Sequence, residues 1–176
     1  DDSTVVENVS SLSALADSML GFAGGASLAI SPVTLRARSD PRPRTSQDPS
    51  EPLWTDDPRQ ATAFGAAWVL AFLASAAEAG FASLTFFELL GPRGVMDDDQ
   101  GFPMLHALAE VAAVEGAFVL PSRSRRPERV LALALRSPGR ARLFLANVTA
   151  DAHPVRIDGL AGRPVRAPLG AGGAGA

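Results

Sequence analysis

Apolar residues in the first part of the chain recur every three or four positions, the spacing of amphipathic helices. This spacing is found in three stretches, residues 5–19, 58–79 and 103–115. Two short β-prone runs separate them, "SLAIS" at 27–31 and "SLTFF" at 83–87, and we expect Pro32 to end the first run. Helices that alternate with short buried strands predict an α/β fold with a parallel sheet.

Local signals mark the ends of the second and third helices. Asp57 suits an N-cap, Pro58 suits the first helical position and Gln60 suits the third. Gly80 suits the residue just past the helix end. Pro103 opens the third helix in the same way. Residues 33–56 contain four prolines and little apolar pattern, so we expect a long loop, and loops of that length are usually functional or disordered.

After Gly116 the pattern changes from helical spacing to β-like segments. "AFVLP", "RVLALALR", "ARLFLANVT" and "PVRIDGL" are separated by turn signals such as "SPGR" and "TADAH". These segments predict a small antiparallel β domain. We therefore divide the chain into a βα part at residues 1–115, an antiparallel β part at 116–168 and a disordered Gly/Ala tail at 169–176.

The βα part is too small to form a complete sheet domain. Parallel sheets bury both faces, and two strands cannot do so beneath three helices. The first helix also has no strand before it, although βα units normally begin with one. We therefore expect the carboxyl-terminal part of a (β/α)8 TIM barrel, its last βα units, followed by the antiparallel β domain.

Composition narrows the possible chemistry. The chain has 176 residues, 47% hydrophobic and 20% charged, with a net charge of -3, which gives no overall attraction to nucleic acid or to an anionic membrane. The absence of cysteine excludes disulfides, thiolate nucleophiles and Cys-ligated metal. All sixteen basic residues are arginine, a bias that GC-rich coding explains.

No cofactor, metal or targeting motif is visible. Walker A, GxGxxG and GxSxG patterns do not occur, and Asp97 to Asp99 match no EF-hand loop. The most apolar stretch, residues 64–87, is interrupted by polar residues and suits a buried helix and strand better than a membrane span. No secretory signal opens the chain. We therefore expect a cytoplasmic protein that has no cofactor, no metal and neither nucleic acid nor membrane as a partner.

Candidate site residues follow the predicted strands, because barrel active sites lie at the carboxyl ends of strands. Glu88 lies within the apolar run "LTFFELL", and an ionised carboxylate buried without a partner costs several kcal/mol or more. We therefore expect Glu88 to leave the core where a site begins, and we expect a loop to follow it, with Arg93 and the acidic run at 97–99. The remaining candidates, on the first strand and the long loop, are Ser31, Arg36, Arg38 and Trp54.

Each candidate has two interpretations. Glu88 suits a general acid or base, a nucleophile or an anchor for a substrate hydroxyl, but also a structural carboxylate paired with an arginine. Arg36 and Arg38 each suit a fork for a carboxylate or for sugar oxygens, or a solvated loop cation. Trp54 suits stacking on a sugar face or anchoring of the loop.

Four segments resemble the barrel of the D-apionate lactonase family: "LAISPVTLRAR" (28–38), "DPRQATAFGAAWVL" (57–70), "SLTFFELLGPRGVM" (83–96) and "FPMLHALAEV" (102–111). The similarity covers roughly residues 1–115, and the later strands resemble the family's carboxyl-terminal β domain. The family's barrel is similar to clan-A glycoside hydrolases. Where the family tends to have a tyrosine before the strand-end glutamate, this chain has Phe86 and Phe87.

The resemblance implies hydrolysis of a sugar-derived lactone in the catabolism of a branched pentose. Glu88 would activate water or orient the sugar, and Arg36 would bind the oxygen-rich ligand. One alternative is a retaining glycosidase in which Glu88 is the nucleophile, about 5 Å from an acid carboxylate on another strand. The other is a non-catalytic relative that binds carbohydrate through Trp54 and the arginine loop. We expect this chain alone to be incomplete as a catalyst.

Overall fold

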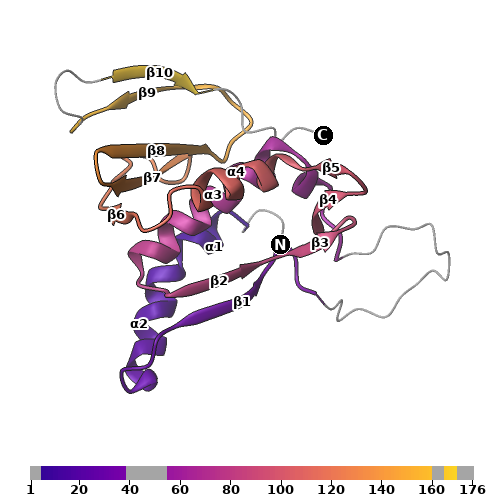
Figure 1. The fold of residues 1–176 in the computed structure, drawn as a ribbon, viewed down its shortest axis with the longest axis horizontal. Coiled ribbons are helices and arrows are strands. Elements are labelled where there is room, and N and C mark those ends of the chain that lie inside the picture. Colours follow the sequence, from indigo (N-terminus) through magenta and orange to yellow (C-terminus); the bar gives the residue numbers. More distant parts are fainter. Residues whose placement is uncertain (1–4, 39–54, 160–164, 170–176) are drawn as a thin grey trace.

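Two parallel strands form the sheet of the first part of the chain, in a computed structural model that describes residues 5–38, 55–159 and 165–169. Strand β1 (Ala29–Val33) pairs in parallel with β2 (Ser83–Phe86), and α3 (Ala63–Glu78) connects them (Figure 1). Helix α2 (Leu12–Ala23) precedes β1, and α4 (Pro103–Ala112) follows β2. The predicted α/β alternation and its parallel pairing are confirmed.

The beginning of this part differs from the prediction in two places. The first helical stretch is divided into α1 (Glu7–Ser10) and α2. Pro32 does not end the first strand, which continues to Val33. The β1–β2 register shifts between Ile30 and Val33, so Pro32 lies where the ladder is irregular and its missing N–H removes no regular ladder bond. The prediction that Pro32 ends the strand was therefore wrong.

The predicted second helix forms as two helices in succession. Asp57 caps a 3-10 helix, η2 (Pro58–Ala61), by accepting a hydrogen bond from the Arg59 backbone N–H at 3.0 Å. Thr62 then caps α3 through its side-chain oxygen, which accepts from the Phe64 N–H. The predicted cap at Asp57 is confirmed, whereas the continuous α-helix from Pro58 is not.

Helix α3 ends at the predicted glycine. Gly80 has a left-handed φ of 84°, and its N–H bonds the Ala77 carbonyl at 3.2 Å. The next N–H, of Phe81, bonds the Ala76 carbonyl at 3.0 Å. This pair of bonds is the Schellman motif, which satisfies the last carbonyls of a helix and favours glycine at the left-handed position.

A small sheet replaces the loop expected after Glu88. Strand β3 (Glu88–Leu90) pairs in parallel with β4 (Gly94–Asp97), which pairs antiparallel with β5 (Gln100–Gly101). A Cβ added at Gly94 would lie 2.6 Å from the Leu90 backbone carbon, so glycine allows these backbones to approach closely. The prediction of an irregular loop here was wrong.

Aromatic side chains of α3 form much of the core against β2. The Trp68 and Phe72 ring centroids lie 5.2 Å apart, and Phe72 meets Phe86 edge-on at 5.8 Å. Phe87 lies 6.3 Å from Trp68. Aromatic pairs at these separations add to the stabilisation from burial. The largest fully buried side chains among the described residues are Val9, Val69 and Met104.

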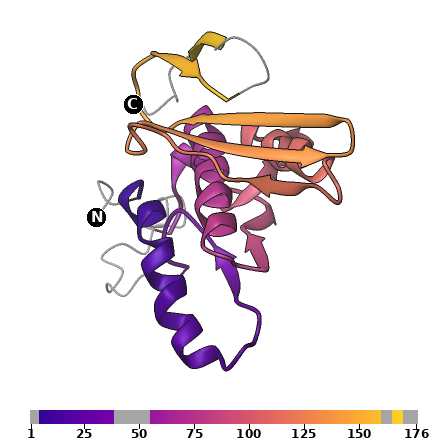
Figure 2. The same ribbon diagram turned by 90° about the vertical axis from the view of Figure 1, so that its left-hand side faces the viewer.

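An antiparallel sheet covers α3 on the side away from β1 and β2 (Figures 1 and 2). Its strands are β6 (Phe118–Leu120), β7 (Val130–Ser137) and β8 (Arg140–Asn147), joined in that order, with the β7–β8 turn at the predicted "SPGR". Leu133 and Leu135 form a second buried cluster with Ala74 of α3. The predicted antiparallel strands are confirmed.

A separate antiparallel pair, β9 (His153–Ile157) and β10 (Val165–Leu169), ends the described chain. Residues 170–176, most of the predicted tail, lie outside the described residues. Ala146 and Val148 belong to the same buried cluster as α3. The division of the chain at residue 116 therefore stays a prediction.

The β1–β2 pair is covered on one face only within the described residues. Leu84 and Phe86 are half-buried and contact the core, whereas the neighbouring Ser83 and Thr85 are exposed. Ala29 and Ser31 are exposed in the same way on β1. None of the helices in the described ranges combines the length and apolarity needed to cross a bilayer.

Candidate active site

Phe87 explains how a carboxylate follows an apolar strand. Its φ of 50° is left-handed, a conformation that costs a non-glycine residue about 1–3 kcal/mol and is often found at functional sites. The turn breaks the alternation of β2, so the Phe87 side chain is buried beside that of Phe86, with ring centroids 5.9 Å apart. Glu88 therefore leaves the core, as predicted, and its side chain is 34% exposed.

Two arginines meet at Glu88. Arg38, from the segment after β1, donates a hydrogen bond from Nη2 to Glu88 Oε1 at 3.3 Å. Arg93, between β3 and β4, places its own Nη2 3.3 Å from the same oxygen, and its Nε lies 3.9 Å from Asp56. The structure thus brings Glu88 together with Arg93 and Arg38.

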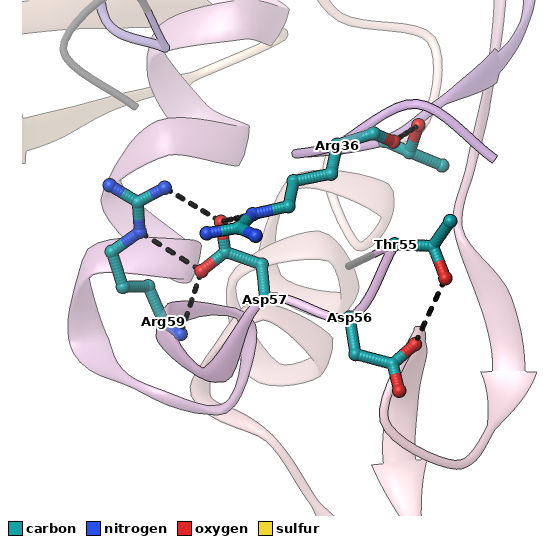
Figure 3. Close-up of polar contacts among 6 residues, drawn as sticks. Arg36, Thr55, Asp56, Asp57 and Arg59 are labelled. Carbon is teal, nitrogen blue, oxygen red and sulfur yellow. Dashed lines mark hydrogen bonds and ion pairs between the residues drawn. The ribbon is translucent and has the colours of Figure 1, made fainter. Parts of the chain in front are cut away.

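A second cluster surrounds Asp57 (Figure 3). Its Oδ1 accepts hydrogen bonds from the Arg59 N–H at 3.0 Å and from Arg59 Nε at 2.9 Å. Its Oδ2 accepts from Arg59 Nη2 at 2.6 Å and from Arg36 Nε at 3.3 Å. The Asp57 side chain is 1% exposed, and that of Arg36 is 20% exposed. Arg36 is therefore a positioned cation and not a solvated one.

The protonation of Asp57 is biased by these partners. Burial alone raises the pKa of its carboxyl. Hydrogen bonds from the Arg59 side chain and backbone, together with the charges of Arg59 and Arg36, outweigh burial and hold the pKa below its ordinary value. Asp57 is therefore a structural anion that stays charged at neutral pH.

Gln60 connects the two clusters. Its buried side-chain amide donates a hydrogen bond to the Gly94 carbonyl at 2.6 Å, joining η2 to the strand after Arg93. Sequence reasoning treated Asp57 and Gln60 only as capping positions and missed both long-range contacts. The sequence signal for these long-range contacts was weak, because capping of the adjacent helix already explains why an aspartate and a glutamine stand at these positions.

The structure places the other predicted residues outside these two clusters or does not describe them. Ser31 lies on β1, exposed on the uncovered face of the sheet. Trp54 lies outside the described residues. Asp97 ends β4, and Asp98 and Asp99 form the turn to β5; all three are exposed. Across the described ranges, no group of His, Asp and Glu is placed to share a metal ion.

An apolar groove of about 400 Å³ runs beside β1, between α1, α2 and α3. Leu12 and Leu15 line one side, and Val33 and Phe72 line another. Its polar lining residues are Asn8, Ser11, Thr34 and Arg36. Arg36 also belongs to the Asp57 cluster, so the groove reaches that cluster. Glu88 is not among its lining residues.

We call the charged residues of the two clusters the rim; they are Arg36, Arg38, Asp56, Asp57, Arg59, Glu88 and Arg93. The rim can form ionic interactions and hydrogen bonds with a ligand. Glu88 Oε2 can accept a proton or a hydroxyl hydrogen bond, and the guanidinium groups of Arg38 and Arg93 can donate to an oxyanion or a carboxylate. Such groups at the carboxyl ends of parallel strands form the usual site of a barrel enzyme.

Comparison with known proteins gives one match. Residues 1–116 match the family model described as "D-apionate lactonase, TIM barrel domain". No curated protein and no solved structure matches the chain.

Proposed function

The chain belongs to the D-apionate lactonase family, and from this membership we propose that it hydrolyses a sugar-derived lactone to the corresponding aldonic acid. The matched residues include β1, β2 and the rim residues Glu88, Arg93 and Arg36. A lactone is a neutral cyclic ester with several hydroxyl groups, which suits a rim rich in hydrogen-bonding side chains.

We further propose that the βα part is the last two βα units of a (β/α)8 barrel, followed by an antiparallel β domain. The uncovered face of β1 and β2 supports this, because parallel sheets bury both faces. Ala29, Ser31, Ser83 and Thr85 on this face would line the barrel interior.

The proposed reaction begins with Glu88 as general base. Oε2 takes a proton from a water molecule while the water oxygen bonds the lactone carbonyl carbon, and the carbonyl electron pair moves onto its oxygen. Arg93 stabilises this oxyanion by donating hydrogen bonds. When the intermediate collapses, the ring C–O bond breaks and the leaving alkoxide takes the proton back from Glu88.

The remaining predicted residues bind the ligand in this proposal. Arg36, held by Asp57, donates to ligand oxygens at the end of the groove. Ser31 meets the ligand from the uncovered sheet face. Stacking of Trp54 on the sugar ring stays a prediction.

One observation carries the proposal: Glu88 leaves the core at the carboxyl end of β2, where Arg38 and Arg93 both contact its Oε1. Glu88→Gln keeps the shape but removes the base, so kcat on an aldonolactone should fall about 10²–10⁴-fold in the full-length enzyme. Glu110→Gln, which alters an exposed ion pair with Arg142, is the matched control.

The same assays separate the alternatives. Turnover of an aryl glycoside, with none of the lactone, would favour the retaining glycosidase, and saturable sugar binding without turnover would favour a non-catalytic relative. Equal lactone turnover by wild type and Glu88→Gln would remove Glu88 from the mechanism. The unfolding free energy of each variant confirms that it is folded.

A further inference from the structure

Two of the rim carboxylates are held in very different ways. Asp57 is 1% exposed and receives hydrogen bonds from two arginines and a backbone N–H. Glu88 is 34% exposed, and Arg38 and Arg93 contact its Oε1. The first carboxylate is fixed in the fold, whereas the second is held at the surface.

Exposure makes the Glu88 contacts exchangeable. The Arg38 and Arg93 side chains are 55% and 34% exposed, so solvent and solutes reach both guanidinium groups. Exposed ion pairs contribute only about 0–1 kcal/mol, because water solvates the separated ions almost as well. A carboxylate from a ligand can therefore replace that of Glu88 at little cost.

We propose that Arg38 and Arg93 form a carboxylate clamp, which holds Glu88 in the free protein and the carboxylate of an aldonate in the complex. This inference rests on the proposed function, whose product is an aldonate. Guanidinium groups match the planar geometry of carboxylates and donate charge-assisted hydrogen bonds. The clamp binds the product, and its Arg93 also stabilises the oxyanion in the proposed reaction.

Charge favours the anionic product over the neutral lactone. The rim has four arginines, at positions 36, 38, 59 and 93, and three carboxylates, at positions 56, 57 and 88, for a net charge of +1. One bound aldonate makes the rim neutral. Because Glu88 competes for the same two guanidinium groups, it weakens product binding and favours product release.

The test is calorimetric titration of the full-length protein with D-apionate, and with the matching neutral alditol as a control ligand. D-apionate should bind at least tenfold more tightly than the alditol. Arg38→Gln and Arg93→Gln should each weaken D-apionate binding about tenfold or more, because a charge-assisted hydrogen bond is worth roughly 1.5–3 kcal/mol. Arg142→Gln, on the exposed Glu110 pair, should leave binding unchanged.

Glu88→Gln gives the decisive result. Removing the competing carboxylate should tighten D-apionate binding severalfold, which a purely structural role for the two arginines does not predict. Unchanged or weaker binding in Glu88→Gln, or equal affinity for D-apionate and the alditol, would overturn the clamp. If Glu88→Gln loses lactone turnover but does not bind D-apionate more tightly, the proposed function stands and the clamp is wrong. If it binds D-apionate more tightly but keeps full turnover, the clamp stands and the role of Glu88 as base is wrong.

Discussion

Asp57 and Arg36 form an ion pair of 3.3 Å although they are 21 positions apart in the chain, and this pair ties the segment after β1 to the start of η2. Arg59 completes the cluster from the next turn. Because the Asp57 side chain is almost fully buried, its charge depends on these partners. The cluster therefore fixes the shape of the rim from which Glu88, Arg38 and Arg93 act.

Asp57→Asn should destabilise the protein markedly. Breaking a buried, hydrogen-bonded ion pair leaves uncompensated charge, and we expect a loss of about 3 kcal/mol in the free energy of unfolding, measured with urea. Asp158→Asn is the matched control, because Asp158 pairs with Arg156 two positions away, as Asp57 pairs with Arg59, but at an exposed site. The control should cost less than about 0.5 kcal/mol. Similar losses in both variants would show that Asp57 has no special role.

The stability contributed by Asp57 should disappear in acid. Its folded-state pKa is lowered, whereas an unfolded aspartic acid has a pKa of about 3.9. The contribution is therefore fully present above the unfolded pKa and is lost as the pH falls through the folded pKa. The difference in unfolding free energy between wild type and Asp57→Asn should shrink from pH 5 towards pH 2, and a constant difference would contradict the assignment.

Gly65→Ala should destabilise α3 where it meets η2. An added Cβ would lie 2.6 Å from the Gln60 carbonyl oxygen and 2.7 Å from Met104 Cε, so the backbone must shift. We expect a loss of about 2 kcal/mol in unfolding free energy. Gly21→Ala is the control within α2, where nothing lies within 4 Å, and it should stabilise by about 0.5–1 kcal/mol. A neutral Gly65→Ala would contradict the tight contact.

Trp68→Phe should also destabilise the core. The indole Nε1 donates to the Val5 carbonyl at 2.9 Å, and phenylalanine would leave this buried acceptor unpaired at a cost of about 1–3 kcal/mol. In a Trp54→Phe background, Trp68 is the remaining tryptophan. Its emission should be blue-shifted in the folded protein and move to longer wavelength on unfolding. Emission typical of water in the folded state would contradict its burial.

Local signals in the sequence predicted the helix ends well. The caps at Asp57, Gly80 and Pro103 depend on residues only a few positions away, and their geometry is as expected. The prediction for Pro32 was wrong, because a proline is tolerated inside β1 only where its pairing with β2, a strand far along the chain, is irregular. The sheet around β4 was missed because its strands are too short to show a period.

The candidate site was predictable in outline only. The position of Glu88 followed from the cost of burying a carboxylate at the end of an apolar run. Nothing local indicated the left-handed Phe87, and the loop sequence did not show that Arg38 would meet Glu88 while Arg36 would meet Asp57. These pairings depend on the path of the chain between distant elements, which spacing alone does not determine.

The one-sided cover of β2 means that folding and ligand preference can be altered through separate positions. Leu84 and Phe86 contact the core, while Ser83 and Thr85, which alternate with them along the strand, face the opposite way and are exposed. We expect combinatorial libraries at positions 83 and 85 to sample new ligand shapes at nearly constant stability, which makes this strand a practical starting point for redesigning specificity.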